Sequence, residues 1–230
     1  MCLAAAALPP ASAIPVGTSN LPREYVVGNN LPRIFSCGVY AADIQRDADI
    51  GSTTVPMEYS KGMAYVGVDV VRFATLYGAI GVNNTKVSQW MEDTDETALD
   101  YEGGLTLRFL DQEIMDPTLM ENRLRICAGV SYSQTTFSLG GQSKDWGELQ
   151  ASVIVSIVND LTGDRLFLPD SIAIYAGPLY SDIISNEIDE STQFGFAVGI
   201  QVFLDEHTSL DFGIRQFDST GYAGGVHVRF

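Results

Sequence analysis

Two histidines, His207 and His227, are the side chains of this sequence best suited to acid–base chemistry near neutral pH. Catalysis by histidine needs an orienting acid and a nucleophile or water within hydrogen-bond reach. His207 lies in the segment Asp205-Glu206-His207-Thr208, whose composition is typical of a solvated turn. His227 lies beside Arg229 near the end of the chain, and Asp211 on the preceding segment is a natural partner for its ring. We therefore predict a structural contact for His227 and no catalytic residue.

A second candidate site is the acidic run that contains Glu92, Asp93, Asp95 and Glu96. Several carboxylate oxygens in one loop can hold a divalent cation, although a solvated loop is the commoner role of such a run. Phosphate-binding loops, dinucleotide fingerprints and zinc-type cysteine spacings are absent from the sequence. The residues therefore predict no cofactor and offer this run as the one metal candidate.

The charge balance limits the partners of the protein. The 230 residues contain 29 acids and 13 bases, which gives a formal net charge of −16. Such a balance excludes a typical nucleic-acid binder, which needs a basic patch, and argues against adhesion to anionic lipid headgroups. Apolar residues make up 46% of the chain, so the composition is not that of a disordered protein.

The clearest structural pattern is an alternation of apolar and polar residues, in which every second side chain points to the same face of a strand. In 99–109, Leu99, Tyr101, Leu105, Leu107 and Phe109 share one face, and the other face contains charged residues and Thr. The segments that follow this pattern number about ten, with eight as the alternative if 66–72 is one bent strand. The predicted strands are 33–45, 60–71, 74–88, 97–110, 122–137, 146–158, 170–184, 191–204, 208–217 and 221–230.

The two faces of these strands differ in a way that distinguishes a membrane barrel from a soluble one. One face is rich in Leu, Val, Ile, Phe and Tyr, as lipid requires, and the other is rich in Gly, Ser, Thr and Gln. We therefore predict an all-β fold, a closed antiparallel up-and-down transmembrane β-barrel. Its lumen is expected to hold a network of opposite charges formed by Asp100, Glu102, Arg108, Arg125, Asp211, Arg215, His227 and Arg229.

The first 32 residues are predicted to lie outside the barrel. Residues 1–13 resemble the end of a signal peptide, with an apolar run that leads to Ala11-Ser12-Ala13, although the usual basic start is missing, as in a truncated N-terminus. Residues 14–32 are predicted to be a flexible periplasmic lead-in. The single barrel domain is then expected to occupy 33–230.

The last ten residues carry the most specific pattern of the chain. In Gly221–Phe230, the outward side chains Tyr222, Val226, Val228 and Phe230 alternate with Gly225, His227 and Arg229. This ending resembles the C-terminal assembly signal of small bacterial outer-membrane β-barrel proteins of the OmpA-like transmembrane-barrel type, which end in an aromatic residue. The resemblance implies the outer membrane as the location, periplasmic termini, and the barrel-assembly machinery as a partner during biogenesis.

With periplasmic termini, the acid-rich stretches 43–49, 92–100 and 182–190 are expected to be extracellular loops. The leading functional hypothesis is a non-enzymatic, monomeric barrel in contact with lipid and lipopolysaccharide, either structural or a narrow porin-like pore for water and small solutes. One alternative is a surface adhesion or binding protein that uses the acidic loops. Another is an outer-membrane hydrolase of the lipid A or protease type, which the position of the histidines disfavours.

Overall fold

The computed structural model describes residues 34–50, 52–87, 97–114, 122–139, 142–161, 169–185 and 189–230. The strands in these ranges are β1 (Phe35–Ile50), β2 (Thr53–Val71), β3 (Ala74–Val87), β4 (Thr97–Ile114), β5 (Asn122–Leu139), β6 (Gln142–Asp160), β7 (Ser171–Ile184), β8 (Asp189–Glu190), β9 (Phe194–Phe203), β10 (Thr208–Gln216) and β11 (Thr220–Arg229). The predicted signal peptide, the lead-in and the acidic run at 92–96 lie outside the described residues.

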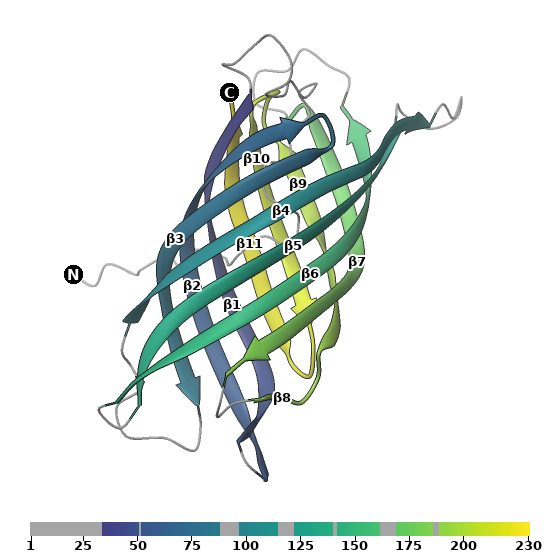
Figure 1. Ribbon diagram of the computed structural model, residues 1–230. Helices are drawn as coiled ribbons and strands as arrows, with labels where there is room; N and C mark the ends of the chain where they lie inside the picture. The colour runs from purple at the N-terminus through teal and green to yellow at the C-terminus, as the bar shows by residue number, and fades with distance from the viewer. Residues whose placement is uncertain are drawn as a thin grey trace, which may run out of the picture.

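Ten of these strands form a closed antiparallel β-barrel, and all ten are strongly tilted (Figure 1). Each strand pairs with the next strand of the ring, and β11 pairs with β1 to close it, with Ser36–Asp43 opposite Tyr222–Arg229. The short β8 lies outside the ring and pairs with Ala48 and Asp49 of β1. No helix in the described ranges is long and apolar enough to cross a membrane.

The ten-strand prediction is confirmed, and the eight-strand alternative is wrong. The chain does not continue through 66–72 as one bent strand. Strand β2 ends at Val71, and a turn at Arg72 and Phe73 separates it from β3. Alternating burial runs through nearly the whole of β2, where odd-numbered residues from Val55 to Asp69 are buried. The same period of two that identified the strands therefore determines which face of the wall each side chain occupies.

The expectation that 43–49 is a loop is wrong, because β1 continues to Ile50 and pairs with β2 along its whole length. Asp43, Asp47 and Asp49 alternate with the buried residues Ile44, Arg46 and Ala48. Acidic side chains at alternate positions on the outer face do not interrupt a strand whose inner face is packed. Asp182 is likewise part of β7 rather than of a loop.

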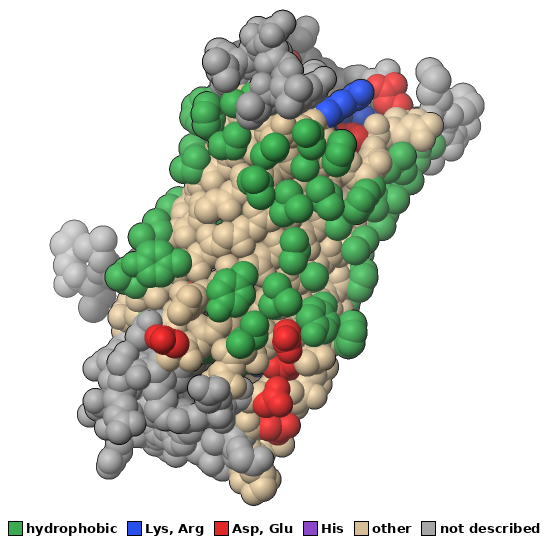
Figure 2. Space-filling view, in the orientation of Figure 1, with side chains coloured by type: hydrophobic (Ala, Val, Ile, Leu, Met, Phe, Trp, Pro, Cys, Tyr) green, Lys and Arg blue, Asp and Glu red, His purple; other side chains and the backbone are tan. Residues whose placement is uncertain are grey.

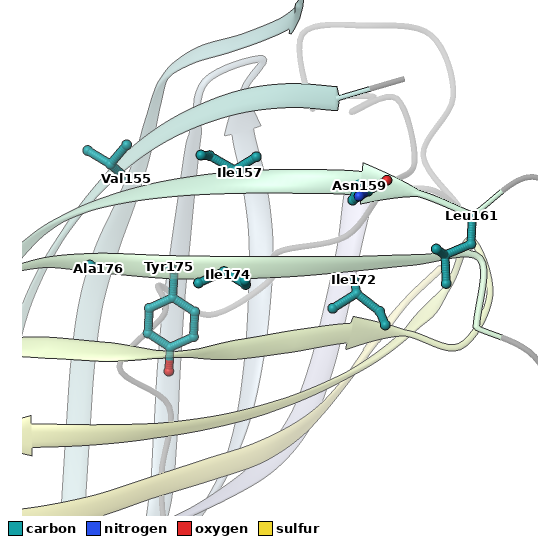
Figure 3. Close-up of a pocket in the computed structure, with 8 residues that line it drawn as sticks. All are labelled: Val155, Ile157, Asn159, Leu161, Ile172, Ile174, Tyr175 and Ala176. Carbon is teal, nitrogen blue, oxygen red and sulfur yellow. The ribbon is translucent and has the colours of Figure 1, made fainter. Parts of the chain in front are cut away.

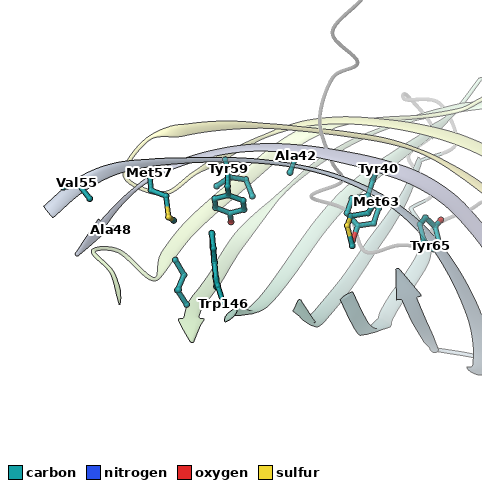
Figure 4. Packing of buried hydrophobic residues seen from close by; sticks show 11 residues of the cluster. Tyr40, Ala42, Ala48, Val55, Met57, Tyr59, Met63, Tyr65 and Trp146 are labelled. Carbon is teal, nitrogen blue, oxygen red and sulfur yellow. The ribbon is translucent and has the colours of Figure 1, made fainter. Parts of the chain in front are cut away.

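The interior is more apolar at one end than the sequence predicted. We call the end of the barrel where β1 begins and β11 ends the end with the termini. A buried cluster packs on the inner side of β1 and β2, from the middle of the barrel to the opposite end (Figure 4). Its members are Tyr40, Ala42, Ile44, Ala48, Val55, Met57, Tyr59, Met63, Tyr65, Trp146 and Ile183. The edge of the Tyr59 ring contacts Trp146, with ring centroids 5.2 Å apart and planes inclined by 79°, a favourable arrangement for two aromatic rings. The lumen is therefore packed like a protein core in this region rather than lined only by small polar residues.

The outer face of the barrel is apolar in its middle (Figure 2). Each of the ten barrel strands contributes at least two large apolar side chains that are exposed, such as Val66, Ile80, Ile174 and Phe194, the last 71% exposed. Polar side chains follow toward the end opposite the termini, for example Asp43 after Ala41 in β1 and Gln134 after Tyr132 in β5. The apolar residues thus form a belt that encircles the barrel.

Aromatic residues lie at both margins of this belt. On three strands the last apolar residue of the outer row, at the end opposite the termini, is aromatic: Tyr132, Phe194 and Tyr222. On β7, Tyr180 lies near this margin, followed on the same face by Asp182 and Ile184. Tyr180 and Phe194 contact each other, with ring centroids 5.2 Å apart. The end with the termini has its own aromatic residues, the exposed Phe35, Phe73, Phe109 and Phe230.

The seam between β1 and β11 predicts a disulfide that only a closed ring allows. Cys37 is a free thiol directly opposite Val228. Residues opposite each other in antiparallel strands have Cα atoms about 4.5–5.5 Å apart, within the range of roughly 4.4–6.8 Å that a disulfide spans. We expect Val228→Cys to form a disulfide with Cys37 under mild oxidation, measured as loss of alkylatable thiols in the folded protein.

The matched control is Val198→Cys, an outward position on β9 that has no cysteine opposite it. Its thiol should stay alkylatable under the same oxidation. Equal thiol loss in both variants, or in neither, would contradict the observed register of the seam.

Candidate functional site

The lumen contains all eight side chains predicted to form the charge network. Asp100, Arg125, Asp211, Arg215, His227 and Arg229 are buried, and the side chains of Glu102 and Arg108 are largely buried as well. All eight side chains face the interior of the barrel. The sequence predicted a network of opposite charges without assigning individual pairs, and several of the partners lie outside the predicted set.

His227 forms a buried chain of hydrogen bonds across three strands. Its Nε2 lies 2.9 Å from Oδ1 of Asp211 on β10, and its Nδ1 lies 2.8 Å from the hydroxyl oxygen of Tyr65 on β2. Because a carboxylate can only accept, Nε2–H donates to Asp211 and the tyrosine hydroxyl donates to Nδ1. Gly38 makes room for this chain, since a Cβ at that position would meet the Tyr65 ring at 2.6 Å. Both ring nitrogens are thus engaged by the protein itself.

His207 is held in the turn between β9 and β10. Asp205 accepts hydrogen bonds from the backbone N–H groups of His207 and Thr208, each 2.7 Å long. Slight burial acts to raise the pKa of Asp205, but these donors outweigh it and lower the pKa below its usual value. The Nδ1 of His207 lies 2.7 Å from the backbone carbonyl of Arg229. This histidine therefore fastens the turn to the last strand.

Arg229 pairs with Asp69 of β2, a residue that the sequence interpretation did not include. The hydroxyl of Thr75 also donates to Asp69. Strand β1 lies between β2 and β11 in the ring, so these side chains reach past it on the inner face of the wall. Asp69 is detectable in the sequence only by continuing the alternation from Lys61 along the same strand.

In the middle of the barrel, Lys61 is the cation that neutralises Glu102. Its Nζ lies 3.0 Å from Oε2 of Glu102, and the Tyr77 hydroxyl donates to the other oxygen at 2.9 Å. Within the predicted network, Asp100 and Arg108 are too far apart to pair. Asp100 and Arg108 lie eight residues apart on one strand, about 26 Å at the usual rise per residue.

Arg108 and Arg125 instead share Asp111 near the end that carries the termini. The distances to Oδ2 of Asp111 are 2.9 Å from Nη1 of Arg108 and 3.2 Å from Nε of Arg125. The guanidinium of Arg125 also lies over the ring of Phe203, 5.7 Å from its centroid. Asp111 lies just beyond the predicted strand 97–110 but belongs to β4, which extends to Ile114.

The opposite end is braced across the lumen by Arg46 and Glu148, neither of which the sequence interpretation included. Nη1 of Arg46 lies 3.7 Å from Oε1 of Glu148, and Glu148 also accepts hydrogen bonds from Tyr59 and Ser181, at 2.9 and 2.6 Å. Strands β1 and β6 are diametrically opposed in the ten-strand ring. This group of four side chains therefore connects opposite walls of the barrel.

Arg46 also fastens the residues that follow β8. Its Nη2 donates to the backbone carbonyl of Thr192 at 2.7 Å, and its guanidinium lies over the ring of Phe217, 4.9 Å from the centroid. Phe217 begins the turn between β10 and β11. The connections at this end are thus held against the mouth of the barrel by a residue that is itself fully buried.

With this geometry established, comparison with known proteins adds no assignment. Neither a scan against protein-family models nor a search of curated proteins finds a match for the chain. The functional interpretation therefore depends on the geometry of the described residues.

The metal candidate and the cysteines offer no further site. Glu92, Asp93, Asp95 and Glu96 lie outside the described residues, and within the described ranges no group of three or more His, Cys, Asp or Glu side chains could hold a metal ion. Cys37 and Cys127 form no disulfide and lie on the outer and inner faces of different strands. The site is therefore a set of hydrogen-bonded and ion-paired side chains inside the barrel.

The brace predicts a large loss of stability when its acid is removed. Glu148→Ala leaves the fully buried Arg46 without its carboxylate and takes an acceptor from Tyr59 and Ser181. Breaking a buried ion pair in this way costs about 3–5 kcal/mol, and we expect that loss in the free energy of unfolding measured by urea titration of the folded barrel.

Glu148→Gln keeps an oxygen for the hydroxyl donors and should lose less. The control is Glu58→Ala, an exposed acid on β2, expected to change the free energy of unfolding by less than about 0.5 kcal/mol. A loss for Glu148→Ala no larger than that of the control would contradict a stabilising role for this brace.

Proposed function

We propose that the protein is a bacterial outer-membrane barrel of non-enzymatic, structural function, with a lumen closed by its own side chains. The proposal has two parts, a location in the membrane and a closed interior. Each rests on a different surface of the same ten strands.

The exposed apolar belt supports the membrane location. Soluble monomers rarely expose contiguous apolar patches of more than a few hundred Å², whereas here large apolar side chains are exposed on every barrel strand. Along β9 the outer row runs from Phe194 to Leu204, the residue after the strand. Ten residues rise about 33 Å along a strand, and a tilt of about 40° reduces this to about 25 Å, the height of the apolar band in outer-membrane barrels. The aromatic margins are typical of the same class.

The proposal of a closed interior rests on the side chains that cross the lumen. Arg46 and Tyr59 reach Glu148 from the opposite wall, and Arg215 on β10 donates to Gln150 on β6 at 3.3 Å. Arg46, Asp69 and Asp211 are each 0% exposed although they face the interior. A water-filled pore would leave inward charges hydrated. Ten strands enclose a space that side chains can largely fill, which favours a structural barrel over a pore.

The engaged histidines support the absence of enzymatic function. His227 is bonded at both ring nitrogens, and His207 is bound to the backbone of the last strand. His207 is exposed, but it lies in the turn at the end of the barrel where β11 ends, which is the periplasmic end in this proposal. The hydrolase alternative, which needs a histidine at the extracellular rim, is therefore disfavoured.

Bilayer recording tests both parts of the proposal. Folded wild-type protein should require detergent or vesicles to stay in solution, and should show no conductance steps after insertion into a planar bilayer. Insertion is verified separately by heat-modifiable migration of the folded barrel in electrophoresis. Folding without detergent would overturn the membrane location, and regular conductance steps would overturn the closed lumen.

Assembly by the barrel-assembly machinery, which the resemblance of the last strand implies, predicts a specific role for Phe230. Its side chain is 54% exposed, and its N–H donates to the carbonyl of Phe35 at 3.0 Å, a bond that does not depend on the ring. Phe230→Ser should therefore reduce the amount of barrel assembled in cells severalfold, while unassisted folding into vesicles changes little.

Phe109→Ser is the control, because Phe109 is an outward phenylalanine at the same end of the barrel and is 66% exposed. It should assemble in cells nearly as well as the wild type. Equal assembly defects in both variants would indicate a loss of lipid contact rather than of a signal.

A further inference from the structure

The outer wall is hollowed between β6 and β7 (Figure 3). The groove has a volume of about 550 Å³, within the range of roughly 300–1,000 Å³ that is usual for ligand sites. Its walls are the outward side chains Val155, Ile157, Asn159, Leu161, Ile172, Ile174 and Ala176, together with part of Tyr175. All but Asn159 and the tyrosine hydroxyl are apolar.

A defect in the sheet adjoins this groove. Val155 pairs with Ala176 and Ser152 pairs with Leu179, but between them Val153 and Ile154 have no partners opposite Gly177 and Pro178. Proline lacks the N–H that a ladder needs. Beside the defect, Ala176 contributes only a methyl group between the larger Ile174 and Pro178. The hollow therefore results from the gap in backbone pairing between β6 and β7 and from the small side chain of Ala176.

One end of the groove presents hydrogen-bond acceptors. The side-chain oxygen of Asn159 is buried and has no hydrogen-bond partner. Asp170 lies at the same end of the groove, because its backbone carbonyl accepts a hydrogen bond from the N–H of Leu161 at 2.8 Å. Asp170 is exposed. The nearby Arg123 is engaged by Asp160 at 3.2 Å. Among the described residues at this end, the acceptors that are not engaged by a cation therefore complement a cationic donor.

We propose that this groove binds one acyl chain of a phospholipid whose ammonium headgroup is held by Asp170 and Asn159, as in phosphatidylethanolamine. The inference rests on the membrane location proposed above. The groove lies within the apolar belt, and its polar end is on the side of the termini, where Asn159, Leu161 and Ile172 lie at or beside the ends of their strands. An acyl chain would pack against the apolar walls of the groove. An ammonium group would donate hydrogen bonds to the oxygens of Asn159 and Asp170.

The experiment uses the full chain, folded in detergent with equal amounts of phosphatidylethanolamine and phosphatidylglycerol, and measures retained lipid by native mass spectrometry. Ala176→Phe fills the groove from its own wall. Ala64→Phe is the matched control, an exposed outward alanine on β2, five strands away on the opposite side of the ring. Wild type and Ala64→Phe should each retain one phosphatidylethanolamine, and Ala176→Phe about tenfold less.

A second variant, Asp170→Asn, separates the headgroup from the chain. It should abolish the preference for phosphatidylethanolamine over phosphatidylglycerol. Equal retention by Ala176→Phe and Ala64→Phe, equal retention of the two lipids by the wild type, or a lipid-free dimer that buries this wall would overturn the inference. A wild-type barrel that needs detergent but retains no lipid overturns only this inference, whereas folding without detergent overturns the membrane location itself.

Discussion

The hydrogen bonds between β1 and β11 are the constraint on which the rest of the structure depends. Eight consecutive residue pairs join strands that are separated by nearly the whole chain. Without that seam, two strand edges would expose unpaired N–H and C=O groups, which costs several kcal/mol for each group in hydrocarbon. Closure removes both edges at once, and it also sets the circumference of the ring and hence the size of the interior.

A ring of ten strands leaves an interior that side chains can nearly fill, and this determines the chemistry inside. Charged groups there are removed from water and must find partners within the barrel. Asp69 meets Arg229, Glu102 meets Lys61, and Asp211 meets His227. At the end opposite the termini, the partners reach across the full width, and Arg46, Tyr59 and Glu148 brace opposite walls. The same pairing that stabilises the charges also obstructs the lumen.

The outside follows the opposite rule. On the outer face the side chains are apolar and exposed. The wall is nearly continuous because each strand forms backbone hydrogen bonds with both of its neighbours. The groove beside Gly177 and Pro178 departs from this continuity, since two residues of β6 lack ladder partners on β7. In the proposed membrane location, a lipid with an ammonium headgroup would fit both the apolar hollow and the unpaired amide oxygen.

The sequence by itself determined the strands and their faces. Alternation is a local property, so segments such as Leu99–Phe109 and Gly221–Phe230 showed their inward and outward rows without any knowledge of neighbours. The same rule places Asp69 inside along the predicted strand 60–71. Arg46 lies just beyond the predicted strand 33–45, because the acid-rich stretch 43–49 predicts a loop. The closed ring of ten antiparallel strands, expected from these rows, is the architecture observed.

Only the tertiary structure decided which inward charges meet and how the interior is filled. Lys61 and Glu102 are two strands apart, and Arg46 and Glu148 are five apart, so their contact depends on the register of every strand between them and on the curvature of the ring. Asp100 and Arg108, two members of the predicted network, share a strand and are held apart by its length. The physical reason is that alternation assigns a side chain to a face, whereas its height and partner on that face are set by hydrogen-bond registers summed around a closed barrel.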